Sequence, residues 1–332
     1  MYCGRRRGGR SGREPVTCSE LVAHVISLIF AMKRSLEAVS SASASVPPAP
    51  EASSVPPDDL SDLPASWACV CLGVSGSVAA VKAPELALAF LRHGVSVDLV
   101  VTEAAHSLLL SSYRGEQPWA RLEAIAAATA LHGGVDANDQ GCGGNGGGSG
   151  ATPAAAATAS PPSLRIFRDA DEWRTFSIVG QDPVVHIELA KRNQLLLIAP
   201  LCANTLAAAA LGLCGNLLGS VLRAWYYDLD AAFATPLAER YGAHAVDKPV
   251  LVAPAMNTFM WHQRVTGSHL AALEARGVRV VPPVAKKLAC GDTGVGAMAE
   301  VPQVVQAAVE ALRKHTQAQE QAVREGRPPF VP

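Results

Sequence analysis

Short apolar segments alternate with longer, helix-like segments along most of this chain, and this alternation limits the folds that it can adopt. Strand-like runs lie at residues 69–74, 95–101, 194–199, 249–253 and 278–281. Helix-like segments lie at residues 77–92, 103–112, 205–213, 266–276 and 301–315. Such alternation predicts an α/β fold, in which a parallel sheet carries helices on both faces in three α/β/α layers. Ligands of such sheets bind at the carboxyl ends of the strands.

Two low-complexity regions divide the 332 residues. Residues 33–66 are mostly Ser, Ala, Pro and Glu, and we expect a disordered leader over residues 1–66. Residues 133–162 are Gly-rich and then Ala/Pro-rich, which predicts a surface insertion within the domain. The remaining residues 67–316 form one domain of ordinary size, followed by a flexible tail over 317–332. A further surface excursion is expected at residues 229–246.

The charge balance gives no drive toward polyanions. The formal net charge is -1, so we expect neither nucleic acid nor a membrane as a partner. The apolar run over residues 21–32 is shorter than the roughly 20 residues that span a bilayer. Eight cysteines without paired metal-ligand spacing suit a reducing compartment and indicate no metal site. We expect a cytoplasmic protein. The Arg/Gly-rich residues 1–14 leave targeting to an organelle open. Met32 is an alternative start of translation.

A glycine-rich turn joins the first strand to the first helix. Gly73 and Gly76 permit tight backbone geometry, and the hydroxyls of Ser75 and Ser77 add hydrogen-bond donors. N–H groups at a helix start favour an anion, so a phosphate is the natural guest. The turn lacks the G-x-G-x-x-G pattern of dinucleotide sites, and a mononucleotide such as FMN suits it better. Glu103, after the second strand, keeps an NAD site as the weaker alternative. A strand–helix turn with a serine cap and no ligand is the purely structural alternative.

Polar residues also follow two later strands. Asn204 and Thr205 come after the strand at 194–199, where they can cap a helix or face a planar ring. Asn257 comes directly after the strand at 249–253, between Met256 and Met260. Its amide can bind a carboxylate, although an Asx turn is an equally simple interpretation.

Two further residues carry candidate chemistry. Cys290 precedes a segment with three glycines, at residues 291–296, which predicts a mobile loop that can close over a substrate. Lys286 and Lys287 come just before this cysteine, and nearby cations lower a thiol pKa. His186 lies just before a predicted helix, and a neutral imidazole there can act as a base. An isolated histidine is more often structural.

Taken in this order, these segments resemble the homo-oligomeric flavin-containing cysteine decarboxylases, and among them the phosphopantothenoylcysteine decarboxylases of plants and animals. The resemblance covers roughly residues 68–316, and residues 254–257 and 288–300 are its most specific parts. It implies a flavodoxin-like or Rossmann-like sheet, FMN as cofactor, and homotrimers with each site at a subunit interface. The implied reaction is the decarboxylation of 4′-phosphopantothenoylcysteine to 4′-phosphopantetheine in coenzyme A synthesis.

The resemblance also implies roles for single residues. His186 is the base and Cys290 the proton donor. The substrate is bound by Asn257, Met260 and Ala289. FMN is bound by Gly76, Ser77, Val78, Thr102, Ala199, Pro200, Leu201, Cys202, Asn204 and Met256.

The chain departs from the family pattern at three places. Cys202 stands where Ser is usual, Gly215 stands where Asp is usual, and Arg192-Asn193-Gln194 replaces Trp-Ala-Asp. Two other functions stay open. Some relatives are regulatory subunits that inhibit a phosphatase, but these carry a long acidic tail and can lack part of the catalytic set. Others decarboxylate the C-terminal cysteine of a peptide.

Overall fold

The computed structural model describes residue 60 and residues 62–132, 160–174, 176–179, 181–287, 293–328 and 330. Most of the expected leader and most of the low-complexity insertion lie outside these residues. Leu60 and Leu63 pack against the hydrophobic core, so ordered packing begins a few residues before the expected boundary at Trp67.

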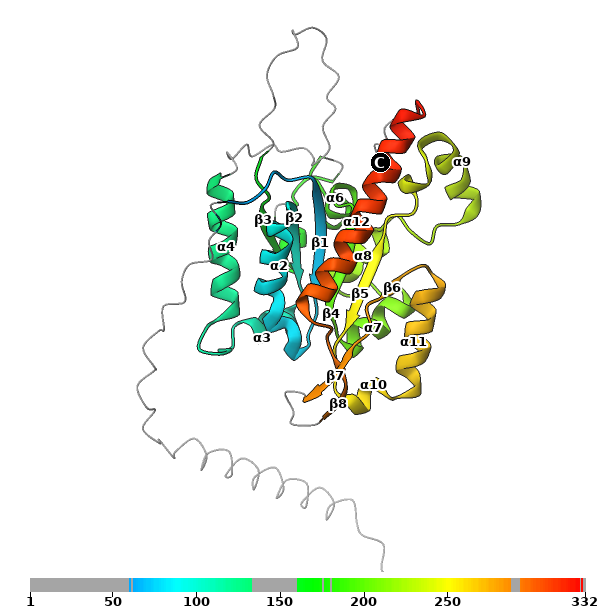
Figure 1. The fold of residues 1–332 in the computed structure, drawn as a ribbon. Coiled ribbons are helices and arrows are strands. Elements are labelled where there is room, and N and C mark those ends of the chain that lie inside the picture. Colours follow the sequence, from blue (N-terminus) through cyan, green and yellow to red (C-terminus); the bar gives the residue numbers. More distant parts are fainter. Residues whose placement is uncertain are drawn as a thin grey trace, which may run out of the picture. The chain divides into compact units, whose positions relative to one another are not determined.

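A six-stranded sheet forms the centre of the domain (Figure 1). All of its strand pairs are parallel, in the order β3-β2-β1-β4-β5-β6. The strands are β1 (Ala68–Val74), β2 (Val95–Val101), β3 (Leu164–Arg168), β4 (Leu195–Leu201), β5 (Val250–Pro254) and β6 (Arg279–Val280). This order reverses direction between β1 and β4, where doubly wound sheets open a crevice for ligands.

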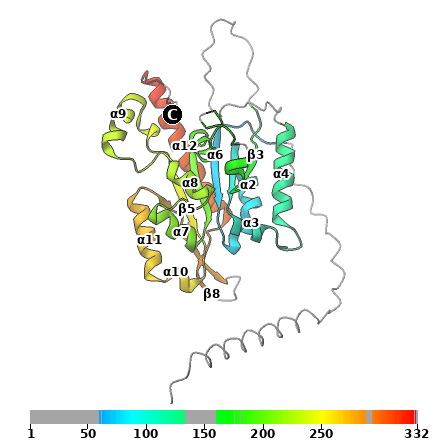
Figure 2. The same cartoon turned by 180° about the vertical axis from the view of Figure 1, so that it is seen from behind.

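Helices cover both faces of this sheet, which confirms the predicted three-layer fold. One face packs against α2 (Ala83–Arg92), α4 (Pro118–His132) and α12 (Val301–Arg324). The other face packs against α6 (Val185–Arg192), α7 (Ala203–Leu211), α8 (Leu217–Ala224) and α11 (Arg264–Ala275), which Figure 2 shows from behind. Strands β1, β2, β4 and β5 are buried along their whole length, because both of their faces are covered.

Several helices begin directly at strand ends because side chains there cap them. Thr102 Oγ1 accepts a hydrogen bond from Ala105 N at 3.3 Å and starts α3 (Glu103–Leu109). Cys202 Sγ accepts one from Thr205 N at 3.5 Å and starts α7. Asn257 Oδ1 accepts one from Phe259 N at 2.8 Å and starts α10 (Thr258–Trp261).

The structure differs from the expected elements in several places. The helix expected at residues 77–92 is a 3-10 turn, η1 (Val78–Lys82), followed by α2, which has Pro84 in its first turn. The alternation also missed α4, β3, and the short α5 (Asp171–Arg174). The excursion at residues 229–246 contains α9 (Ala231–Tyr241) and η2 (Ala243–Ala245).

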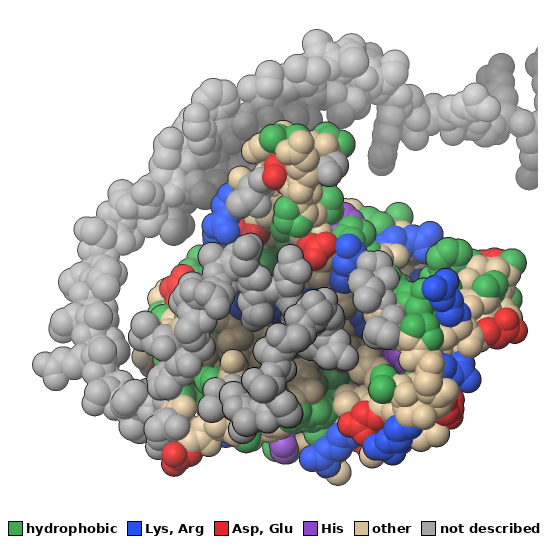
Figure 3. All heavy atoms as spheres, turned by 90° about the horizontal axis from the view of Figure 1, so that it is seen from above, with side chains coloured by type: hydrophobic (Ala, Val, Ile, Leu, Met, Phe, Trp, Pro, Cys, Tyr) green, Lys and Arg blue, Asp and Glu red, His purple; other side chains and the backbone are tan. Residues whose placement is uncertain are grey.

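The predicted flexible tail is wrong for its first part, because α12 continues to Arg324. Ala322 is buried on this extension, and Arg327 donates hydrogen bonds to the carbonyls of Ala238 and Glu239, both at 3.0 Å. The extension therefore packs on α9. Figure 3 views the molecule from the end at which α12 finishes, and there the coloured acidic and basic side chains are interspersed. Among the described helices, none is both long and apolar enough to cross a membrane.

Candidate functional site

Backbone and hydroxyl groups link the carboxyl ends of β1 and β4. Ser75 donates to the carbonyl of Pro200 through both its N–H, at 3.2 Å, and its hydroxyl, at 2.7 Å. The Ser75 Oγ in turn accepts a hydrogen bond from Cys202 N at 2.8 Å. The sequence predicted that the Ser75 hydroxyl would be a donor to a phosphate. This prediction is wrong, because Ser75 is fully buried and its hydroxyl is not available to a ligand. It instead fixes the spacing of the two strand ends.

The glycine turn after β1 packs tightly on the start of α3. A Cβ atom on Gly76 would lie 2.6 Å from the Cβ of Ala104, so this position has no room for a side chain. Ser77 caps η1 by accepting a hydrogen bond from Ala79 N at 3.5 Å. The close packing of Gly76 leaves Ser77 and Val78 turned toward a cavity.

A short hairpin covers the end of β5. Its strands are β7 (Val284–Lys287) and β8 (Thr293–Ala297), which pair antiparallel. Met256 N donates to the carbonyl of Gly296 at 2.8 Å. Gly294 lies against Thr258, because a Cβ atom there would come within 2.7 Å of that side chain. The mobile loop predicted from the glycines is therefore partly wrong, since Gly294 and Gly296 belong to a strand that needs them for close packing.

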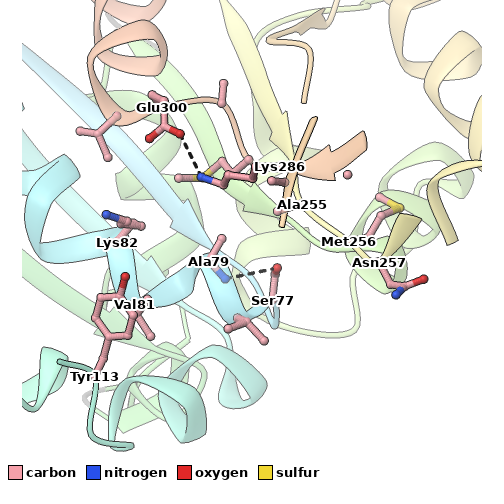
Figure 4. A pocket seen from close by; sticks show the side chains of 16 residues that line it. Ser77, Ala79, Val81, Lys82, Tyr113, Ala255, Met256, Asn257, Lys286 and Glu300 are labelled. Carbon is pink, nitrogen blue, oxygen red and sulfur yellow. Dashed lines mark hydrogen bonds and ion pairs between the residues drawn. The ribbon is translucent and has the colours of Figure 1, made fainter. Parts of the chain in front are cut away.

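A cavity of about 510 Å³ opens between these segments (Figure 4). Ser77 and Ala79 lie on one side of it, and Met256 and Asn257 lie on the other. Of the predicted site residues, those in the cavity wall are Ser77, Val78, Met256 and Asn257. The other lining residues are Ala79, Val81, Lys82, Tyr113, Ala255, Lys286, Gly296, Ala297, Met298, Ala299, Glu300 and Val301. The volume is typical of ligand sites, which span roughly 300–1,000 Å³.

Charged residues that the sequence reasoning did not assign to the site also line this cavity. Lys286 Nζ lies 2.9 Å from Glu300 Oε1, and the hydrogen bond from Lys286 lowers the pKa of the Glu300 carboxyl. Lys82 Nζ lies 2.9 Å from Glu85 Oε2. Lys82 is the last residue of η1, the short helix that Ser77 caps, and this proximity in sequence could have suggested it. No local signal marks Tyr113.

Other predicted flavin residues lie near the cavity in the fold but are not in its wall. Ala199, Pro200 and Leu201 belong to β4, and Gly76, Thr102 and Cys202 lie just after strand ends. Asn204 is exposed on α7. Burial opposes ionisation of the Cys202 thiol, but its hydrogen bonds with Ser75 and Thr205 outweigh burial and lower its pKa. Thr102 and Cys202 act as helix caps, which is a structural role.

The residues with predicted catalytic and substrate roles are not all brought together. His186 is the second residue of α6, rather than just before a helix, and it is not part of the cavity wall. Its Nδ1 lies 2.5 Å from Glu172 Oε1, a partner that the sequence reasoning did not single out. Met260 is 42% exposed on α10 and also lies outside the wall. Ala289 and Cys290 lie outside the described residues.

Comparisons with known proteins show the family of this chain. The family model named Flavoprotein matches residues 65–313. Phosphopantothenoylcysteine decarboxylase of Oryza sativa subsp. japonica is 36% identical over 240 residues, which cover 72% of this chain and 78% of the rice protein. Phosphopantothenoylcysteine decarboxylase of Mus musculus is 42% identical over 157 residues, which cover 47% of this chain and 67% of the mouse protein.

A solved structure of a related protein supports the fold. It is a PPC decarboxylase variant complexed with pantothenoylaminoethenethiol, and it aligns with a TM-score of 0.50 at 32% identity. The alignment covers 74% of this chain and 98% of the solved chain.

Proposed function

Because this chain belongs to the Flavoprotein family, in the group of the phosphopantothenoylcysteine decarboxylases, we propose that it is an FMN-dependent decarboxylase. Its substrate is 4′-phosphopantothenoylcysteine, and its product is 4′-phosphopantetheine. The observation that carries this proposal is the single cavity that Ser77 and Val78 share with Asn257. A turn suited to phosphate and an amide suited to carboxylate thus face one space, as a site for a flavin nucleotide and an amino-acid-derived substrate requires.

The residues present fit FMN. Ser77 and Val78 follow a glycine turn at a strand end, where backbone N–H groups favour a phosphate. Gly76 lets the turn pack against α3 without a side chain in the way. Met256, Met298 and Val78 give the cavity apolar surface suited to a ring system. When bound, FMN supplies the oxidation of the substrate thiol that makes loss of carbon dioxide possible.

The chain's own residues orient the substrate and move protons. Asn257 lines the cavity and uses Oδ1 to cap α10, so its amide nitrogen is the group that would donate a hydrogen bond to the substrate carboxylate. His186 accepts the thiol proton of the substrate at the start of the reaction. After carbon dioxide leaves, Cys290 gives its thiol proton to the carbon of the enethiolate.

His186 must reach the cavity from elsewhere, because it is not in the cavity wall of its own chain. We propose a homotrimer in which His186 of one subunit completes the cavity of another. Large apolar side chains are exposed on the described surface, as such an assembly requires: Trp173 is 62% exposed, Leu211 67% and Phe259 76%.

Asn257→Asp tests the function with the fold held constant. Asp caps helices as well as Asn does, so α10 should form, while the new charge repels the substrate carboxylate. We expect purified wild-type protein to release FMN on denaturation and to form carbon dioxide from 4′-phosphopantothenoylcysteine. Asn257→Asp should retain the flavin but lose at least about tenfold in kcat/KM.

Asn216→Asp is the matched control. Asn216 caps α8 in the same way, by accepting from Gly219 N at 2.8 Å, and it lies outside the cavity wall. This variant should behave as wild type. A peptide ending in cysteine serves as the competing substrate in the same assay. Faster turnover of the peptide would reassign the substrate, and a yellow protein inactive on both would indicate the regulatory function.

A further inference from the structure

A carboxylate lies directly behind the imidazole of His186. The distance from His186 Nδ1 to Glu172 Oε1 is 2.5 Å, so the two groups are in direct hydrogen-bond contact, closer than the roughly 2.7–2.9 Å of most charge-assisted N–H···O hydrogen bonds. The Glu172 side chain is 8% exposed, whereas the His186 side chain is 24% exposed. The pair therefore has a buried acid on one side and an accessible ring on the other.

Both residues are held by well-defined local structure. Glu172 lies on α5, where Asp171 accepts a hydrogen bond from Arg168 N at 2.8 Å. Asp169, just before α5, accepts another from Leu217 N at 3.0 Å and so ties this segment to α8. His186 lies in the first turn of α6, which packs against α8 as well. Two elements fixed to the same helix thus set the distance between the carboxylate and the ring.

The chemistry of the pair fixes the position of one proton. An ionised carboxylate only accepts hydrogen bonds, so beside one the proton of a neutral imidazole lies on the facing nitrogen, here Nδ1. The lone pair of Nε2 then becomes the basic position of the ring. Glu172 Oε2 is buried and has no hydrogen-bond partner among the described residues, so its charge has no second donor in this part of the chain. A buried carboxylate of this kind is best compensated when the adjacent ring becomes a cation.

We propose that Glu172 is a positioning residue that holds His186 in the Nδ1–H tautomer and directs Nε2 at the substrate thiol. This inference rests on the proposed function. In the step, the S–H bond breaks and an Nε2–H bond forms, which gives a thiolate and an imidazolium. The Nδ1 proton stays between the ring and Glu172, whose carboxylate stabilises the new positive charge. The same arrangement of carboxylate and imidazole is used by catalytic triads.

The experiment has one arm that does not depend on activity. Nitrogen NMR of histidine-labelled, full-length protein reports which ring nitrogen carries the proton, and His186→Asn assigns the signal. We expect wild type to show the Nδ1–H tautomer and Glu172→Gln to show a mixture, because an amide can either donate or accept. A wild-type ring protonated on Nε2 would overturn the proposal even if the protein decarboxylates its substrate.

The second arm separates positioning from a merely structural role. We expect Glu172→Gln to lower kcat for 4′-phosphopantothenoylcysteine at least about tenfold, with KM within about twofold and flavin content unchanged. Glu188→Gln is the matched control on α6, since its side chain is 52% exposed and pairs only with Lys191 in the described residues. It should keep wild-type turnover.

The outcomes are distinguishable. Full turnover by Glu172→Gln would overturn the proposal, and so would a parallel loss of flavin and folding stability, because that indicates a structural anchor. If Glu172→Gln does not fold, Glu172→Asp, which keeps the charge on a shorter side chain, should retain the tautomer and part of the turnover; loss of both would also count against it. If wild type itself releases no carbon dioxide, the proposed function fails, while the tautomer still decides the role of Glu172.

Discussion

Met256 N donates a hydrogen bond to the Gly296 carbonyl at 2.8 Å, and the same two residues touch so closely that Gly296 cannot carry a side chain. A Cβ atom at this position would lie 2.4 Å from the Met256 carbonyl oxygen. Gly296 also has φ 142°, which other residues rarely adopt. The contact attaches the β7–β8 hairpin to the end of β5 and so forms part of the cavity wall.

Gly296→Ala should therefore detach the hairpin. We expect a loss of at least about 2 kcal/mol in the free energy of unfolding, together with loss of turnover, because both backbone strain and a backbone clash oppose alanine. Urea denaturation measures the first and a carbon dioxide assay the second. Gly215→Ala is the control, because its Cβ would meet nothing within 4 Å and its φ is not positive. Equal stability of the two variants would contradict the packing argument.

Ser77 offers a test of the phosphate turn that avoids a steric change. Gly76→Asp would introduce a charge but also a clash with Ala104, so its effect could not be interpreted. Ser77→Asp keeps a capping side chain and places a negative charge in the cavity wall, where it should repel the FMN phosphate. We expect at least about tenfold weaker FMN binding, measured by flavin absorbance during dilution. Ser77→Asn has nearly the same shape without the charge and should remain yellow; a colourless Asn variant would contradict this explanation.

The roles of His186 and Cys290 can be separated by mixing two inactive variants. His186→Asn should release no carbon dioxide and leave the flavin absorbance unchanged, because the thiol keeps its proton. Cys290→Ser should still release carbon dioxide once and lose the flavin absorbance, because a hydroxyl is too weak an acid to replace the thiol. Co-expression of the two variants should restore part of the activity if one site uses residues from two subunits. Mixed oligomers without turnover would argue against a shared site.

Asp98 should be a large contributor to stability. It is fully buried in β2, where it accepts hydrogen bonds from Arg165 Nε at 2.9 Å, from Asn193 Nδ2 at 2.8 Å, and from Arg192. Asp98→Ala leaves these donors without their acceptor, so we expect a loss of about 3–5 kcal/mol, measured by urea denaturation. Glu310→Ala removes an exposed ion pair with Lys314 and should leave the denaturation midpoint unchanged. A similar result for both variants would show that burial of Asp98 has little energetic consequence.

His315 should make the fold sensitive to acid. Its side chain is 6% exposed on α12, and burial, followed by the charges of Lys248 and His244, lowers its pKa from 6.5 to about 3. Because the unfolded chain takes up this proton near pH 6.5 and the folded chain only near pH 3, stability falls as the pH decreases between these values. At pH 4.5 the loss amounts to about 3 kcal/mol.

His315→Leu cannot take up this proton. Its free energy of unfolding, measured in urea at pH 7 and pH 4.5, should therefore fall less with acid than that of wild type. The exposed His93 provides the control, and His93→Gln should show the wild-type difference. If His315→Leu loses as much stability as wild type over this range, other groups cause the acid sensitivity.

The sequence by itself determined the features that depend on neighbouring residues. The alternation of apolar strands with helices predicted the three-layer fold. Asn257 was expected just after a strand, and the structure places it after β5 and in the cavity wall. These signals are local, because a strand needs only its own apolar residues and a helix start needs only one capping side chain. The departure at Arg192-Asn193-Gln194 carried no such signal, and only the structure shows that Arg192 and Asn193 bind Asp98.

Tertiary structure alone decided which groups face a ligand and which are used internally. Ser75 and Ser77 looked equivalent in the sequence, but Pro200, 125 positions away, takes the Ser75 hydroxyl and leaves Ser77 at the cavity. Gly294 and Gly296, two of the three glycines that predicted a mobile loop, instead lie in a strand against Thr258 and Met256. Glu172 reaches His186 only because α5 and α6 are both fixed to α8. Such choices depend on distances between atoms far apart in the chain, and packing of the whole core sets these distances, whereas local preference leaves them undetermined.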